Sequence, residues 1–177
     1  DLKYLSDPRL QGRATGSEGS QRAREYIAER FQQLSLATLP ELDRFFHGFD
    51  YQSGFNSISG VNVIGVVAGA QLSPSTIVIT AHYDHIGRFQ GRIHPGADDN
   101  ASGVAVLLAL AARAIQQPLQ HRLMFLATDA EEKGLIGAKA FFADARINKV
   151  GIQANLNLDM VAQMGKRKRL YVTGEKT

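Results

Sequence analysis

Short apolar runs alternate along this chain with stretches of helical periodicity, and this alternation constrains the fold more than any other feature of the sequence. Runs of strand length occupy residues 61–67, 76–81, 122–127 and 152–158, and apolar residues recur at helical spacing over residues 23–34, 101–116 and 135–144. Strands that alternate with helices are typical of an α/β fold with a largely parallel sheet. The absence of an internal repeat or low-complexity linker favours one domain over residues 1–177.

Two regions give weaker signals. Residues 36–60 are interrupted by proline and glycine, although residues 44–49 could form an edge strand. Residues 170–173 are a further strand candidate. The basic run at residues 166–169 is interpreted as a solvated turn rather than as a patch for an anionic ligand.

Composition excludes several classes of function. The chain has no cysteine, which excludes disulfide scaffolds, thiolate-bound zinc and thiol nucleophiles. Any metal must therefore be held by histidine, aspartate and glutamate. The net charge of +3 is too small to indicate a nucleic-acid partner, and no apolar run approaches the length of a membrane span.

Acidic and imidazole side chains cluster at strand ends and before one helix. The four segments are HYDH at residues 82–85, PGADDN at residues 95–100, DAEE at residues 129–132 and DM at residues 159–160. In open α/β sheets, ligands and chemistry gather beyond the carboxyl ends of the strands. We therefore expect these side chains to meet at one edge of the sheet.

So many carboxylates at one edge would repel one another without a compensating cation. Imidazole and carboxylate without thiolate suit zinc or a related transition metal in a catalytic site. His82 and Asp84 lie two residues apart at a strand end, so Asp84 is expected to hydrogen-bond and orient the His82 imidazole. The adjacent Glu131 and Glu132 point apart, so one can bind metal while the other faces a water molecule.

Each of these residues also has an ordinary structural interpretation. A single buried histidine is more often structural than a ligand, paired acidic residues are usually solvated, and Asp159 could cap a helix. Their coincidence in four segments favours the metal site. His47, His94 and His121 lack this context and are interpreted as structural or surface residues. His85 is expected to line the pocket and is not assigned as a ligand.

Together the four segments resemble the M28 peptidases, zinc aminopeptidases and relatives that share an α/β/α fold. The matching motifs are HYDH at residues 82–85, GADDNASG at residues 96–103, DAEE at residues 129–132 and NLDM at residues 157–160. The opening LQGRATGS at residues 10–17 is also similar to a segment of many bacterial members. The resemblance covers nearly the whole chain and implies a three-layer α/β/α domain with a mostly parallel sheet.

The resemblance also implies two zinc ions and their ligands. It makes His82 and Asp159 ligands of one zinc ion and Glu132 a ligand of the other. Asp98 would bridge the two ions. The family normally supplies a further histidine to the second ion from beyond the Asp159 segment, but no histidine follows His121. The domain is therefore expected to be incomplete at its C-terminal end.

Further roles follow from the same resemblance. Glu131 would be the general base, Asp84 would orient His82, and Asp99 would take part in a strained peptide unit at the bridging aspartate. The implied function is removal of N-terminal residues from peptides or small aminoacyl substrates by a metal-activated water.

Two alternatives stay open. A glutaminyl-cyclase-like acyltransferase would use a single zinc ion, whereas the Asp98–Asp99 pair favours the two-metal hydrolase. A non-catalytic binding domain or inactive fragment would typically have lost ligands that are retained here. The resemblance further implies an exported, periplasmic or extracellular bacterial protein, although no signal segment is present in this sequence.

Overall fold

The computed structural model describes residues 1–70, 75–163 and 173–174. The elements run in the order α1 (Leu2–Leu5), η1 (Pro8–Leu10), α2 (Glu18–Gln33), β1 (Phe46–Ser53), β2 (Asn56–Val67), β3 (Thr76–His82), β4 (Arg88–Phe89), β5 (Arg92–Ile93), η2 (Ala97–Ser102), α3 (Gly103–Gln116), β6 (Arg122–Thr128), α4 (Ile136–Ala143) and β7 (Ile152–Asn157). The expected strand at residues 170–173 and the basic run at residues 166–169 lie outside the described residues, apart from residue 173. No helix in the described ranges combines the length and the apolar character needed to cross a membrane.

Five strands form a mixed sheet in the order β1-β2-β6-β3-β7. Strand β3 pairs parallel with both β6 and β7, as the alternating pattern predicts. Strands β1 and β2 join antiparallel, as a hairpin whose second strand also pairs antiparallel with β6. The sequence pattern does not reveal this hairpin because the first half of β2 is polar and largely exposed.

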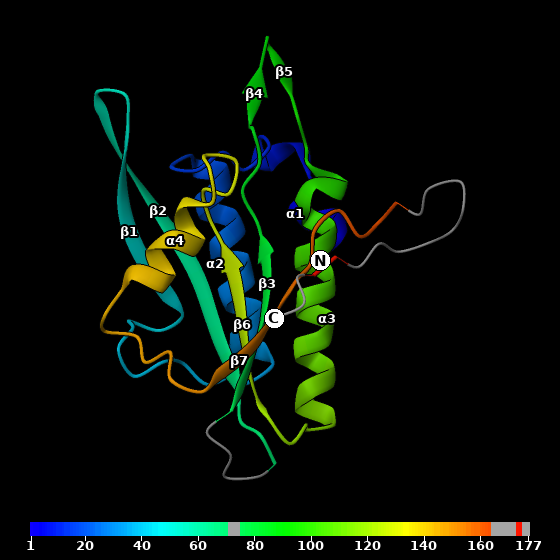
Figure 1. Ribbon diagram of the computed structural model, residues 1–177. Coiled ribbons are helices and arrows are strands. Elements are labelled where there is room, and N and C mark those ends of the chain that lie inside the picture. The colour runs from blue at the N-terminus through cyan, green and yellow to red at the C-terminus, as the bar shows by residue number, and fades with distance from the viewer. Residues whose placement is uncertain (71–74, 164–172, 175–177) are drawn as a thin grey trace.

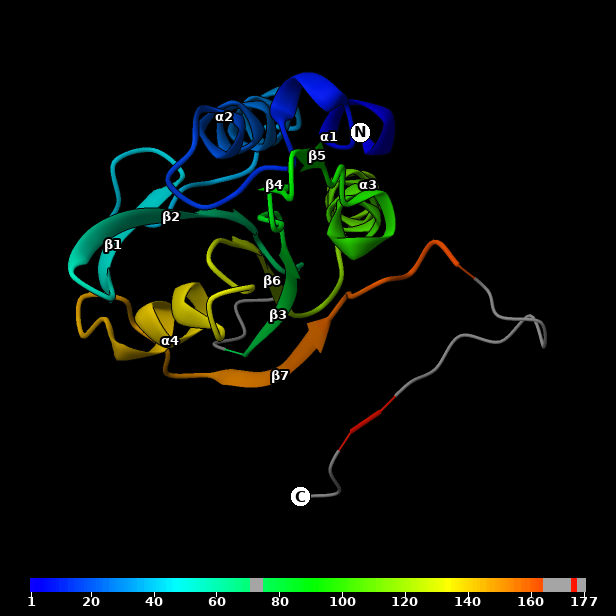
Figure 2. The same cartoon turned by 90° about the horizontal axis from the view of Figure 1, so that it is seen from above.

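Helices cover both faces of the sheet, as Figures 1 and 2 show: α2 and α3 pack on one face and α4 on the other. Phe125 belongs to the core under α2 and α3, whereas its neighbour Met124 belongs to the core under α4. Both side chains are fully buried. Coverage on both faces explains why β6 is apolar from Leu123 to Ala127, and it confirms the predicted three-layer α/β fold.

Helix α2 follows its sequence signals closely. Ser17 precedes the helix and its hydroxyl accepts a hydrogen bond from the Ser20 N–H at 3.1 Å, so it acts as an N-cap. Ala23, Ile27 and Phe31 form the buried stripe.

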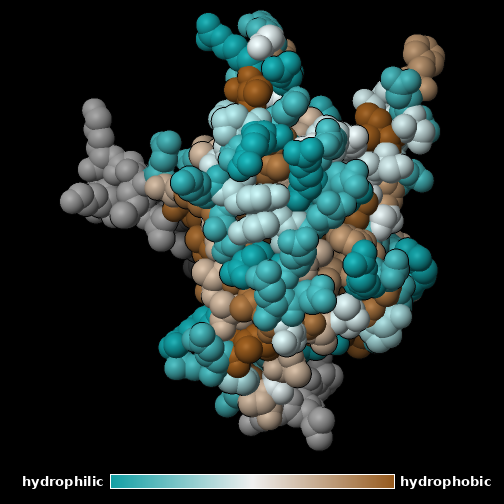
Figure 3. Space-filling model, turned by 180° about the vertical axis from the view of Figure 1, so that it is seen from behind, coloured by the Kyte–Doolittle hydropathy of each residue, from teal (hydrophilic) through white to brown (hydrophobic). Residues whose placement is uncertain are grey.

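The face of the molecule seen from behind carries mostly hydrophilic side chains with scattered apolar ones (Figure 3).

The register of the parallel strands brings the chemistry-bearing segments to one level. His82 at the end of β3 lies opposite Thr128 at the end of β6. The Tyr83 N–H donates to the Thr128 carbonyl at 2.9 Å, and the Leu158 N–H donates to the Thr80 carbonyl at 2.8 Å. The three loops that follow β3, β6 and β7 therefore start side by side.

A close contact joins the start of α2 to the turn η1. A Cβ built on Gly19 would lie 1.8 Å from the carbonyl oxygen of Leu10. The backbone of residue 10 cannot move freely, since the Arg13 N–H donates to the same carbonyl at 2.9 Å. The absence of a side chain at residue 19 is thus a packing requirement.

We predict that Gly19→Ala lowers the free energy of unfolding by about 1–3 kcal/mol, the usual cost of overpacking. Helix propensity alone would favour alanine by roughly 0.5–1 kcal/mol, so the predicted sign is opposite to that of an unpacked helix position. Urea unfolding of the wild type and of the variant gives the change in the free energy of unfolding and its sign. Gly48→Ala is the matched control, because a Cβ there meets nothing within 4 Å. A stabilised Gly19→Ala variant would contradict this packing.

Candidate metal centre

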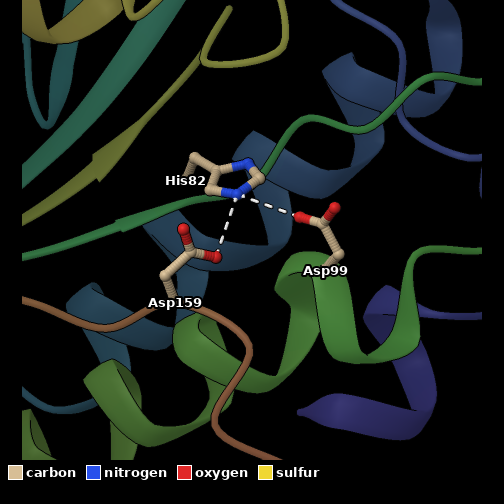
Figure 4. Close-up of side chains that lie close together, drawn as sticks. All are labelled: His82, Asp99 and Asp159. Carbon is tan, nitrogen blue, oxygen red and sulfur yellow. Dashed lines mark ion pairs between the residues drawn. The ribbon is translucent and has the colours of Figure 1, made fainter. Parts of the chain in front are cut away.

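His82 is the central donor of the cluster. Its side chain is 4% exposed, and its Nδ1 lies 3.1 Å from the backbone carbonyl oxygen of Asp84. A carbonyl only accepts, so Nδ1 carries a hydrogen and Nε2 faces the cluster. Nε2 lies 3.1 Å from Oδ1 of Asp99 and 3.5 Å from Oδ1 of Asp159 (Figure 4). Glu131 Oε2 follows at 3.9 Å.

The turn η2 delivers Asp99 to this cluster and also holds the segment that carries Asp159. The buried Asn100 side chain donates to the Leu158 carbonyl at 2.8 Å and accepts from the Met160 N–H at 3.3 Å. Ser102 Oγ accepts from the Val161 N–H at 3.1 Å. The side chains around Asp99 therefore fix the backbone on both sides of Asp159, although the two residues are far apart in sequence.

Asp99, and not the expected Asp98, is the carboxylate that belongs to both candidate metal-binding groups. Asp98 Oδ1 instead accepts the Ala162 N–H at 3.0 Å, and neither candidate metal-binding group contains Asp98. Asp98 thus fastens the chain after β7, and the carboxylate that belongs to both candidate groups is that of Asp99. The peptide bond between Asp99 and Asn100 is cis, so the unusual peptide unit also lies one residue later than expected.

Asp84 acts differently from the expectation. Its carboxylate oxygens accept the backbone N–H groups of Glu131 and Glu132 at 3.0 and 3.2 Å. Its Oδ1 lies 3.6 Å from His82 Nδ1, and the closer partner of that nitrogen is the Asp84 carbonyl. Asp84 therefore orients His82 mainly through its backbone, while its buried carboxylate fixes the loop that carries both glutamates.

Glu131 and Glu132 point to different partners, as the sequence predicts for adjacent residues. Glu131 approaches His82 Nε2, whereas Glu132 Oε1 lies 2.8 Å from Nδ1 of His85. Partial burial, together with the carboxylates of Asp84 and other neighbours, raises the pKa of Glu131 above its usual value, against an opposing effect of His82. A raised pKa makes the Glu131 carboxylate a stronger proton acceptor.

A cavity of about 270 Å³ opens beside Glu131. His82 and Asp159 are among its polar lining residues, and Leu135 and Phe142 are among its apolar ones. The cavity therefore joins polar groups of the cluster to apolar side chains of α4 and of the residue before it.

Arg13 was not assigned a role from the sequence, although it lies in the motif at residues 10–17. Its fully buried guanidinium donates to four backbone carbonyls, those of Leu5, Tyr83, Pro95 and Gly96. Burial lowers the pKa of Arg13 to about 10, so it stays charged at neutral pH. Arg13 thus ties the N-terminal segment to the loops that follow β3 and precede η2.

Asp129 is the second buried group, and the sequence analysis placed it in the DAEE segment without giving it a role of its own. Its carboxylate accepts from Thr15 Oγ1 and the Ala130 N–H, both at 2.8 Å, and from the Val61 N–H at 3.1 Å. The Tyr83 hydroxyl lies 2.9 Å away. Burial, with the nearby charge of Asp84, raises the pKa of Asp129. The place of Asp129 directly after β6 was the available signal, and its role is to support the loop.

His47, His94 and His121 lie outside both candidate groups. His47 is buried and contacts Asp144 at 3.2 Å, His121 lies 2.6 Å from Ser75 Oγ, and His94 packs edge-on against the ring of Phe89. His85 is different, because it joins Asp99 and Glu132 in the second group of potential ligands.

The donor set fits a divalent transition metal. His82, Asp99 and Asp159 each offer one ligand atom within 4.8 Å of the others, as do His85, Asp99 and Glu132. Imidazole with carboxylates is the ligand chemistry of catalytic zinc. The close approach of so many carboxylates to His82 also requires positive charge at this point, whether a proton or a metal ion supplies it.

We predict that the metal-free protein loses stability as the pH rises from 6.5 to 9. Burial lowers the pKa of His82, but the surrounding carboxylates, Asp84 foremost, outweigh burial and raise the pKa to about 9. A folded-state pKa above the unfolded value stabilises the protein below pH 6.5, and this contribution is lost as the pH rises through 9. The difference corresponds to about 3 kcal/mol.

Denaturant titrations with a chelator present, repeated across this pH range, measure that loss. His82→Asn should remove most of the pH dependence, whereas His94→Asn should leave it unchanged. An equal slope in wild type and His82→Asn would contradict the raised pKa.

Comparison with known proteins shows which family the chain resembles in sequence. The family model described as Peptidase family M28 matches residues 62–177. The chain is 31% identical over 140 residues to the alkaline phosphatase isozyme conversion protein of Escherichia coli (strain K12), covering 72% of this chain and 40% of that protein. It is 32% identical over 123 residues to aminopeptidase YwaD of Bacillus subtilis (strain 168), covering 67% and 26%. The chain thus spans less than half the length of these two relatives.

Solved structures agree on the fold. BSAP, a zinc aminopeptidase from Bacillus subtilis, matches with a TM-score of 0.73 at 15% identity, covering 90% of this chain and 67% of that one. Porphyromonas gingivalis glutaminyl cyclase matches with a TM-score of 0.74 at 17% identity, covering 90% and 58%. At these identities the likeness concerns the fold alone, whereas the family model covers more than half of this sequence. The chain belongs to peptidase family M28.

Proposed function

We propose that this chain carries the catalytic centre of a zinc-dependent exopeptidase that removes N-terminal residues from peptides. The observation that carries the proposal is the convergence of His82, Asp99 and Asp159 beside Glu131, whose carboxylate lies 3.9 Å from the same imidazole nitrogen. One side chain is thereby available as a base next to a set of metal ligands. The names of an aminopeptidase and a zinc aminopeptidase among the matches support the same reaction.

We further propose two zinc ions, one held by His82, Asp99 and Asp159 and the other by Asp99 and Glu132. Zinc, when bound, supplies a Lewis acid that polarises a carbonyl and lowers the pKa of water. Asp99 supports this assignment because its two oxygens face different partners, Oδ1 toward His82 and Oδ2 toward His85.

Glu131 would act as the general base and then as the acid. Its raised pKa favours taking a proton from the attacking water and returning it to the leaving amine. Asp84 fixes the backbone of residue 131, so the position of the base is set by a partly buried hydrogen bond. This arrangement keeps the base close to the metal ligands without making it one of them.

The substrate would be a peptide with a free N-terminus. Its ammonium group would find the carboxylates of Glu131 and Asp159, which line the cavity and whose side chains are 32% and 46% exposed. Leu135 and Phe142 also line this cavity, which could accommodate an apolar side chain there. An exported location stays a prediction.

Cyclisation of N-terminal glutamine is the second candidate, since glutaminyl cyclases share the fold. Their identity to this chain is 17%, against 32% for aminopeptidase YwaD. The two functions are separated by offering the zinc-loaded chain a glutamine-initiated peptide. Release of free glutamine supports the peptidase, whereas a ring-closed product of unchanged length supports the cyclase.

We predict that Glu131→Gln lowers the rate of aminoacyl-nitroanilide hydrolysis by about 10²–10⁴-fold, the usual contribution of general acid–base catalysis. Zinc content should stay unchanged, because residue 131 is outside both groups of potential ligands. Glu29→Gln, on the surface of α2, is the matched control and should keep the wild-type rate. Wild-type activity in Glu131→Gln, or no chelator-sensitive hydrolysis by the zinc-loaded wild type, would contradict the proposed function.

A further inference from the structure

The hairpin of β4 and β5 projects beyond the sheet at the end where β3 delivers its histidine to the cluster (Figure 1). It connects the loop that carries His85 to the turn η2 that carries Asp99. Its base is fixed, because the His94 N–H donates to the Gly87 carbonyl at 2.9 Å and the Gly87 N–H donates to the Gly12 carbonyl at 3.2 Å. A fixed base holds the hairpin beside the candidate metal centre.

One face of this hairpin combines a cation with aromatic rings. Phe89 and Arg92 are paired across the two strands, so their side chains lie on the same face. His94 packs edge-on against Phe89, with ring centroids 6.3 Å apart. These three side chains and that of Gln90 line a hollow of about 500 Å³, and Phe89 is 58% exposed. Arg88 directly precedes Phe89 in β4 and therefore points to the opposite face.

The exposed guanidinium of Arg92 has no anionic partner in the described part of the chain. None of the described residues forms an ion pair or a hydrogen bond with it. The sequence between His85 and Asp98 contains no acidic residue. A free guanidinium suits a carboxylate, which it can bind through two parallel N–H donors. The hollow around Arg92 therefore complements an acidic group better than a basic or an apolar one.

The hairpin also lies where a bound peptide would continue beyond the cleaved bond. The cavity proposed for the N-terminal residue is lined by Glu131 and Asp159 but not by Asp99. Asp99 and Asp159 approach Nε2 of His82 from different directions (Figure 4). The hairpin belongs to the Asp99 side, because it leads into η2. A peptide whose first residue occupies the cavity can thus pass Asp99 and reach the hairpin.

The length of the connecting chain gives the reach. Strand β4 begins three residues after His85, which is at most roughly 11 Å of chain. We propose that Arg92 and the hollow around it bind a carboxylate of the substrate, about two or three residues beyond the cleaved bond. This carboxylate is either the side chain of an acidic residue or the C-terminal group of a short peptide. The inference rests on the proposed function and names its substrate class, peptides that are acidic after the cleaved bond.

A simpler role for the hairpin is to connect two parts of the centre, with Arg92 pointing into water. Arg88 and Arg92 would then be equivalent, since both are exposed cations on the same hairpin. Arg92→Gln and the matched control Arg88→Gln change the net charge equally. A binding role for the face that carries Phe89 makes the two variants differ.

The test compares kcat/KM of the zinc-loaded chain for matched peptides that begin with leucine. Leu-Ala-Glu-Ala amide against Leu-Ala-Gln-Ala amide tests a side-chain carboxylate, and Leu-Ala-Ala against its amide tests a C-terminal one. Wild type and Arg88→Gln should prefer the acidic member of at least one pair by about 2–5-fold, the range of an exposed ion pair, chiefly through KM. Arg92→Gln should abolish this preference. No preference in wild type, or equal preferences in Arg92→Gln and Arg88→Gln, would overturn the proposal.

Charge reversal provides a second variant. Arg92→Glu should prefer Leu-Ala-Lys-Ala amide to the glutamate peptide, because the repulsive and attractive partners are exchanged. Each preference is a ratio measured on one protein preparation, so a partial loss of folded protein cancels. An Arg92→Glu variant that still prefers the glutamate peptide would count against the site.

Peptide binding separates this inference from the proposed function. Zinc-loaded Glu131→Gln, titrated calorimetrically with the same peptides, reports the preference without hydrolysis. If wild type hydrolyses none of the peptides while acidic peptides still bind more tightly in an Arg92-dependent way, the proposed function alone is contradicted. Hydrolysis without any preference for the acidic peptides contradicts only the inference about Arg92.

Discussion

The register between β3 and β6 is the constraint on which the site depends. Parallel pairing sets His82 level with Thr128. The loop after β3 therefore begins beside the loop after β6, and Asp84 can reach the N–H groups of Glu131 and Glu132. A slip of one residue would turn the side chains of one strand to the opposite face and separate these partners. The apolar cores on both sides of the sheet oppose such a slip.

Much of this could be predicted from the sequence, because each apolar strand ends where its acidic or imidazole residues begin. The parallel strands, the helices α2, α3 and α4, and the gathering of the segments at one edge all follow from that pattern. The hairpin β1–β2 does not, since its exposed polar residues carry no periodic signal. The short β4–β5 hairpin is also missed, for its strands are only two residues long.

The choice between Asp98 and Asp99 shows a different limit. Both are carboxylates before the same helix, and composition or spacing cannot tell them apart. The choice is made by the backbone of η2, where Asp99 has non-helical dihedral angles while Asp98 is turned to the Ala162 N–H. A similar limit hides Arg13, since a sequence shows a basic residue in a polar turn but not the four carbonyls that converge on it.

The carboxylates at this edge fall into two groups by their hydrogen-bond donors. Asp84, Asp98 and Asp129 each accept backbone N–H groups, so their charge is already stabilised by the fold. Among the described residues, the carboxylates of Asp99, Asp159 and Glu131 have no such donor, and their close polar partner is His82.

A carboxylate without donors is costly to hold near others unless a cation joins it. The backbone N–H groups of the fold thus stabilise the carboxylates that fix the loops. It leaves the carboxylates that converge on His82 to be neutralised by whatever positive charge enters the site. The pattern of donors, rather than the number of acidic residues, separates the supporting residues from those that would face a metal ion.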